Sequence, residues 1–174
     1  LAYAGNAYYL ELFHGATIAF KDMALSILPH LMTTSAKKNN VKNEIVILTA
    51  TSGDTGKAAL AGFAEVEGTK IIVFYPKNGV SPVQEKQMVT QKGANTHVIG
   101  IHGNFDDAQA AVKRIFADKA MAADAAAHGV TLSSANSINT GRLIPQIAYY
   151  LLAGAKLGAG ASFDVVVPSG NFGN

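Results

Sequence analysis

The sequence predicts an α/β fold built on doubly wound parallel sheets. Between residues 44 and 133, short β-branched runs alternate with helical stretches, which is the pattern of successive strand–helix units. Most of these runs are apolar along their whole length, as in strands that helices cover on both faces. Internal repeats, which would favour a solenoid, do not stand out in the chain.

Each expected strand combines β-branched or aromatic residues with few charges. In chain order, the expected strands are Tyr8–Phe13, Glu44–Thr49, Lys70–Tyr75, Thr96–Ile101, Val130–Ser133 and Phe163–Val167. The last strand leads into a glycine-rich segment, and such a loop normally continues into a helix that covers the sheet. No such helix follows, so we expect the chain to be a fragment of a longer polypeptide.

The expected helices are marked by apolar residues on one face and by capping residues. In chain order, they are Phe20–Met32, Thr55–Val66, Pro82–Lys92, Phe105–Phe116, Asp118–Ala127 and Gly141–Ala153. Ser81 and Asn104 are residue types that cap helix N-termini, and Pro82 suits the first helical position because its missing N–H is not needed there.

Two polar stretches divide the chain into a small domain inserted in a larger one. Residues 33–43 are polar and charged, and a second boundary is expected near Ser134–Asn139. We therefore predict that residues 1–43 and 134–174 are two parts of a larger domain. Residues 44–133 would form a small β-α domain between them.

The composition excludes several classes of protein and of site. With 14 basic and 12 acidic residues, the net charge of +2 does not indicate a nucleic-acid-binding protein. No apolar run is long enough to span a membrane, and the absence of cysteine excludes zinc–thiolate sites and fits a reducing cytoplasm. Only 15% of residues are charged, against about 25% in an average domain, so we expect more of the same polypeptide to cover part of the surface.

Polar, glycine-bearing segments follow several expected strands, at the edge where α/β sheets bind ligands. The first, residues 50–56, offers hydroxyls, glycines and a helix N-terminus, which suit a carboxylate or a phosphate. The alternative is an ordinary capped turn. A P-loop is excluded because Ala58, rather than serine or threonine, follows Lys57.

The second segment, residues 134–142, is dense in hydrogen-bonding side chains. Its Arg142 lies in the opening turn of an expected helix, where a cation opposes the helix dipole. Such an arginine requires an anionic partner such as a phosphate, or alternatively a local salt bridge. In the third segment, residues 170–174, Gly170 and Gly173 allow backbone amides to converge on an anion.

Lys21 is flanked by small and apolar residues just after the first expected strand. Burial in such surroundings lowers the pKa of a lysine and makes its amine nucleophilic, able to form a Schiff base. The alternative, which spacing alone favours, is a lysine at a helix start that pairs with Asp22. The histidines lack the spacing of metal ligands, and no Gly-x-Ser-x-Gly nucleophile motif is present.

The segments that carry these features resemble threonine synthase, a family of pyridoxal-phosphate enzymes of the tryptophan-synthase-β fold group. They are ELFHGATIAFKDMA (11–24), ATSGDTGKAA (50–59), IIVFYPKNGVSPVQEKQM (71–88), GNFDDAQAAVK (103–113), SSANSINTGRLIPQIAYY (133–150) and VPSGNFGN (167–174). The resemblance covers nearly the whole chain. It implies fold type II of the pyridoxal-phosphate enzymes, with the larger domain as the cofactor domain. Ala16 departs from the proline usual in the family.

The resemblance also implies the residues of the site. Lys21 would form the Schiff base with pyridoxal 5'-phosphate. The cofactor phosphate would be held by the backbone amides of Gly170, Asn171, Phe172, Gly173 and Asn174. The amino-acid end of the substrate would face Ser52, Asp54 and Thr55. The substrate phosphate would lie beside Asn136, Ser137, Asn139 and Arg142.

The implied reaction is that of a carbon–oxygen lyase acting on phosphates, which converts O-phospho-L-homoserine and water to L-threonine and inorganic phosphate. Two alternatives stay open. A threonine-synthase-like phospho-lyase, which eliminates phosphate without adding water specifically, needs the same lysine and loops. The chain could instead be a truncated, inactive fragment that binds no cofactor by itself.

Overall fold

The computed structural model describes residues 2–5 and 7–167 of the 174-residue chain. Strands β1 (Ala2–Ala4) and β2 (Ala7–Tyr9) pair in an antiparallel sheet. The main sheet consists of β3 (Glu44–Ala50), β4 (Thr69–Pro76), β5 (Thr96–Ile101) and β6 (Val130–Ser133). These strands are parallel and lie in the order β5-β4-β3-β6, so that β3 and β4 are central.

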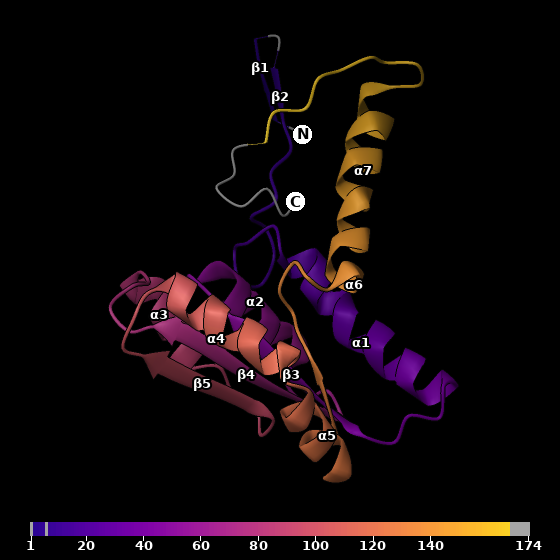
Figure 1. Ribbon diagram of the computed structural model, residues 1–174. Coiled ribbons are helices and arrows are strands. Elements are labelled where there is room, and N and C mark those ends of the chain that lie inside the picture. Colours follow the sequence, from indigo (N-terminus) through magenta and orange to yellow (C-terminus); the bar gives the residue numbers. More distant parts are fainter. Residues whose placement is uncertain (1, 6, 168–174) are drawn as a thin grey trace.

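Helices cover both faces of the main sheet (Figure 1), and the last two follow its final strand. They are α1 (Asp22–Lys38), α2 (Asp54–Phe63), α3 (Pro82–Val89), α4 (Phe105–Ala117), α5 (Lys119–Ala127), α6 (Thr140–Leu143) and α7 (Ile147–Leu157), with a 3-10 turn, η1 (Ile144–Gln146), before α7. The axis of α7 leads away from the main sheet. Among the described residues, no helix is long and apolar enough to cross a membrane.

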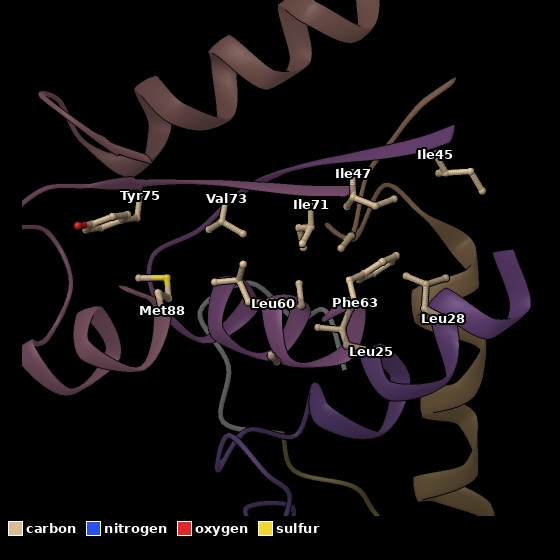
Figure 2. Close-up of a cluster of buried hydrophobic side chains, with 13 residues drawn as sticks. Leu25, Leu28, Ile45, Ile47, Leu60, Phe63, Ile71, Val73, Tyr75 and Met88 are labelled. Atoms are coloured by element: carbon tan, nitrogen blue, oxygen red, sulfur yellow. The ribbon is translucent and has the colours of Figure 1, made fainter. Parts of the chain in front are cut away.

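Alternate residues of the central strands enter two hydrophobic clusters, one on each face. Ile47 and Ile71 pack with Leu25 of α1 and Phe63 of α2 on one face, where strand and helix side chains oppose each other in Figure 2. On the other face, Val46 and its neighbours pack against Ala108 and Val112 of α4. Because both faces are covered, nearly every residue of β3 is buried, and the predicted α/β fold with helices on both sides of a parallel sheet is confirmed.

Several predicted elements match closely. The bounds of β5 and β6 coincide with the predicted strands. The caps are also confirmed: Ser81 forms a capping box with Gln84 at the start of α3, and Asn104 forms one with Asp107 at the start of α4. These boxes satisfy backbone N–H groups that the first helical turn leaves without partners.

Other elements differ, each for a physical reason. The predicted linker is helical up to Lys38, because Ala36 packs on the core and so extends the buried face of α1. The predicted helix 141–153 is divided by the 3-10 turn at Ile144–Gln146, in which Pro145 has no N–H to donate.

Two predicted strands are wrong in whole or in part. Of the strand predicted over residues 8–13, only residues 8 and 9 lie in β2. Residues 163–167 form no strand, and most of them are exposed. An apolar run becomes a strand only where a neighbouring strand supplies partners for its backbone groups, and no described residue does so here.

Helices α1 and α2 cross so closely that the crossing point requires glycine. A Cβ atom on Gly62 would lie 2.1 Å from the Leu25 carbonyl oxygen, a contact that only a backbone shift could relieve. We therefore predict that Gly62→Ala destabilises the protein by about 1–3 kcal/mol, measured by the shift of the urea unfolding midpoint.

The matched control is Gly154→Ala in α7. A Cβ atom there would meet only Phe163, at 3.7 Å, so the substitution should be neutral or stabilising by about 0.5–1 kcal/mol. Equal midpoints for the two variants would contradict the close packing of α1 on α2.

Candidate active site

The predicted loops that follow β3 and β6 meet at the carboxyl edge of the main sheet. Asn136 joins them: its Oδ1 accepts a hydrogen bond from the Ala50 amide at 3.1 Å, and its Nδ2 donates one to the Ala50 carbonyl at 2.8 Å. Asn139 acts within its own loop, where it caps α6 through the Gly141 amide and donates to the Ser134 carbonyl. The amides of both asparagines therefore hold the loops in place.

The loop after β3 is shaped by one buried hydroxyl. Oγ1 of Thr51 accepts hydrogen bonds from the amides of Gly53 and Gly56, at 2.9 and 2.8 Å. Gly53 has φ of +132°, and a Cβ atom there would lie 2.4 Å from the side-chain amide carbon of Gln84. A residue other than glycine would therefore be strained and would displace Gln84.

Asp54 is bound by two side chains that the sequence analysis did not single out. Gln84 Nε2 donates a hydrogen bond to Asp54 Oδ1 at 2.8 Å, and Lys57 Nζ lies 3.1 Å from the same oxygen. Burial by itself would raise the pKa of Asp54, but the hydrogen bonds from Gln84 and Lys57 and the cationic charge nearby hold the pKa below its usual value. Asp54 therefore carries a negative charge at neutral pH.

Lys21 lies immediately before α1, with its Nζ 4.0 Å from the centre of the Phe20 ring. Burial lowers the pKa of Lys21, and the charges of Arg142 and Lys57 lower it further, against the opposing effect of Asp54. This direction agrees with the lowering that the sequence predicts. The alternative pairing with Asp22 is not found: no salt bridge joins the two in the described part of the chain, and Asp22 accepts hydrogen bonds from Thr17 instead.

Arg142 is buried, with 4% of its surface exposed. One of its terminal nitrogens, Nη1, donates to the Ala135 carbonyl at 3.1 Å, whereas its buried Nε has no hydrogen-bond partner among the described residues. The local salt bridge considered as an alternative is also absent from that part of the structure. Burial lowers the pKa of Arg142, so an anion at Nε would stabilise the guanidinium.

Three hydroxyls predicted to contact the substrate have no hydrogen-bond partner within the described ranges. They belong to Ser52, Thr55 and Ser137, on the two loops that Asn136 joins. Their donors are therefore available to a ligand, unlike the amides of Asn136 and Asn139. The predicted phosphate loop, Gly170–Asn174, lies outside the residues that the structure describes.

The charges at this edge of the sheet favour an anionic ligand. Lys57 and Arg142 lie close enough to Lys21 for their positive charges to lower its pKa. Among the carboxylates, Asp54 has the largest opposing effect on that pKa. An unpartnered Nε on a buried arginine indicates where part of that anion would bind. The residues present thus fit a phosphorylated ligand that also reacts with an amine.

Comparison with known proteins agrees with this chemistry. The family described as "Pyridoxal-phosphate dependent enzyme" matches residues 4–174. The chain belongs to this family. Its parallel sheet with helices on both faces is the fold-type-II architecture of these enzymes.

The individual family members to which this chain is similar are threonine synthases and threonine synthase-like proteins. A threonine synthase from Pseudomonas aeruginosa is 46% identical over 171 residues, which are 98% of this chain and 35% of that protein. Threonine synthase-like 1 from Pongo abelii is 40% identical, over 98% of this chain and 24% of that protein. The crystal structure of pyridoxal-phosphate-bound threonine synthase from Brucella melitensis aligns with a TM-score of 0.80 and 43% identity, over 94% of this chain and 34% of that one. The chain thus spans about a third or less of these proteins.

The sequence held a signal for each of the two missed side chains. Ser81 and Gln84 have the spacing of a capping box, which places Gln84 at the first turn of α3. Lys57 follows Asp54 by three residues, the spacing of side chains that meet on a helix. Neither pattern shows that α3 lies beside the loop after β3.

The lowered pKa of Lys21 predicts its reactivity. Since the amine loses its proton at a lower pH than usual, we expect acylation of Lys21 to reach half of its maximal rate at a lower pH than in the urea-unfolded chain. Peptide mass mapping of the cofactor-free protein over a series of pH values measures this midpoint. An equal or higher midpoint in the folded protein would contradict the burial of the amine.

Proposed function

We propose that this chain supplies the reactive lysine and the substrate-phosphate site of a threonine synthase, which converts O-phospho-L-homoserine and water to L-threonine and inorganic phosphate. The proposal rests mainly on the buried Arg142. Its Nε has no partner among the described residues, and it lies close enough to Lys21 for its charge to lower the Lys21 pKa. The threonine synthases similar to this chain support the choice of substrate. Because those proteins are about three times longer, the activity belongs to a polypeptide of their length.

Pyridoxal phosphate, when bound, supplies the electron sink for chemistry at the substrate carbons. In this proposal Lys21 would hold the cofactor covalently until the substrate amine displaces it, and the freed, neutral Lys21 amine would then move protons at the α and β carbons. Its lowered pKa suits that role, since the neutral form is present at a lower pH than for an ordinary lysine.

The remaining residues bind and orient. Arg142 would stabilise the departing phosphate by charge, with the Ser137 hydroxyl beside it. Ser52 and Thr55 would donate hydrogen bonds to the amino-acid end of the substrate, and Asp54 would balance the cations. Asn136 and Asn139 would hold the loops that carry these groups. The amides of Gly170, Asn171, Phe172, Gly173 and Asn174 would bind the cofactor phosphate.

The same proposal includes the domains to which the parts of this chain belong, the compartment in which the protein acts and the rest of its polypeptide. Residues 1–43 and 134–174 would belong to the cofactor domain, and residues 44–133 to a small inserted domain. The protein would act in the cytoplasm, and the rest of the same polypeptide would complete the site.

Product analysis on the complete gene product tests the proposed reaction. Incubation with O-phospho-L-homoserine and pyridoxal phosphate should release threonine and phosphate in equal amounts. Phosphate release with an unsaturated or deaminated product in place of threonine would assign the chain to the phospho-lyases instead. No phosphate release would contradict both reactions and leave the inactive alternative.

Removing the reactive amine should abolish turnover without affecting the fold. We expect Lys21→Ala to lose the covalent cofactor link and all measurable phosphate release, with an unfolding midpoint close to that of the unmodified protein. Lys119→Ala, at an exposed lysine, is the matched control and should keep both. Retained turnover in Lys21→Ala would remove Lys21 from the reaction.

Removing the buried guanidinium should affect the phosphorylated substrate most. Hydrogen bonds to charged groups contribute roughly 1.5–3 kcal/mol, so Arg142→Ala should raise the KM for O-phospho-L-homoserine by about 10- to 100-fold. The dissociation constant of the cofactor should change less, and the exposed Arg114→Ala should change neither. Equal losses for substrate and cofactor would reassign Arg142 to the cofactor.

A further inference from the structure

The turn that carries Lys21 has an unfavourable backbone conformation. Ile18 has φ of +59°, which is costly for a β-branched residue. Within the turn, the Ile18 amide donates to the Gly15 carbonyl at 3.2 Å, and the Asp22 amide donates to the Ala19 carbonyl at 3.0 Å. A conformation of this kind persists only where its surroundings hold it.

Close packing does not hold the turn on all sides. A cavity of about 390 Å³ lies along it, lined among others by Gly15, Ala16, Ala19 and Asp22 of the turn and by Tyr149 of α7. On the side of this cavity the turn has fewer packing contacts than a fully enclosed segment. Hydrogen bonds therefore contribute to the position of Lys21 where packing does not.

One set of hydrogen bonds comes from Asp22, the residue after Lys21. Its Oδ2 accepts from the Thr17 amide at 2.8 Å, and its Oδ1 accepts from the Thr17 hydroxyl. Thr17 itself is buried. The carboxylate thus ties the start of the turn to the first residue of α1.

The other hydrogen bond comes from a distant part of the chain. The phenol of Tyr149, in α7, donates to the carbonyl oxygen of Phe20, the residue before Lys21 and 129 positions away in sequence. The Tyr149 side chain is mostly buried, and burial together with the negative charge of Asp22 raises the pKa of Tyr149 to about 12. The phenol therefore keeps its proton, and so its hydrogen bond, throughout the physiological pH range.

We propose that Tyr149 and Asp22 are positioning residues for Lys21, which fix the peptide on either side of it and so direct its amine into the site. This inference rests on the proposed function only where it predicts an effect on turnover; the predicted position of the Lys21 amine does not depend on that function. It also links two parts of the site, because α6, η1 and α7 carry Arg142 and Tyr149 within one short stretch. The segment that places the guanidinium would then also place the amine.

The test is Tyr149→Phe in the complete gene product, with Tyr150→Phe as the matched control. Tyr150 is the next residue of α7 and is more exposed. Without the hydrogen bond, the Lys21 amine should become more mobile and more hydrated. We expect the pH midpoint of Lys21 acylation in the cofactor-free protein to rise, and kcat to fall about 10-fold with KM changed less than about twofold. Tyr150→Phe should leave all three unchanged.

A second variant tests Asp22 without altering the charge near Lys21. Thr17→Val removes the hydroxyl that donates to Asp22 but keeps the carboxylate, and it should raise the acylation midpoint in the same direction. Thr17→Ser restores the hydroxyl and should return the midpoint to its original value. Substitution of Asp22 itself is less informative, because its charge acts directly on Lys21.

The outcomes separate this inference from the proposed function. If Tyr149→Phe lowers the unfolding midpoint but leaves the acylation midpoint and kcat unchanged, Tyr149 is only structural and the inference is wrong. If the unsubstituted protein forms no covalent link to the cofactor, the proposed function fails. The acylation midpoints would then still show whether Tyr149 and Thr17 position the amine.

Discussion

The burial of cationic groups at one edge of the sheet is the constraint on which the account of this chain depends. Lys57 and Arg142 lie close enough to Lys21 for their charges to lower its pKa, and the guanidinium has a buried Nε without a partner among the described residues. Removing cations from water is unfavourable unless anions compensate them. Asp54 compensates in part, through Lys57 and its effect on Lys21. A phosphorylated ligand would supply the remaining negative charge. Without that ligand, the burial of the cations that bind it is unfavourable.

The parallel sheet brings these groups together from distant parts of the sequence. Strands β3 and β6 are neighbours, so the loops at their carboxyl ends meet, and Asn136 joins them through the Ala50 backbone. Helix α3, which follows β4, contributes Gln84 to Asp54. Helix α7 contributes Tyr149 to the turn of Lys21. The Asp54 carboxylate and the turn of Lys21 are thus held by residues from other elements, and the fold positions these groups through hydrogen bonds between elements.

Sequence reasoning found the groups whose residue type conflicts with their surroundings. A lysine among apolar residues and an arginine at a helix start both require an explanation, and both lie at the edge of the sheet where ligands bind. The strands β5 and β6 were predictable because their apolar runs are bounded by turn residues. Residues 163–167 were not, because an equally apolar run forms no strand without a neighbour. Gln84 and Tyr149 could not be assigned either, since their partners lie 30 and 129 positions away and only the tertiary structure brings them together.

The most direct test of this account is to trap the cofactor on the protein. The complete gene product would be incubated with pyridoxal phosphate, reduced with borohydride, digested and mapped by peptide mass. The account predicts a phosphopyridoxyl group on Lys21. A label on another lysine, or no label on any peptide, would contradict the central claim that the buried Lys21 amine is the reactive group.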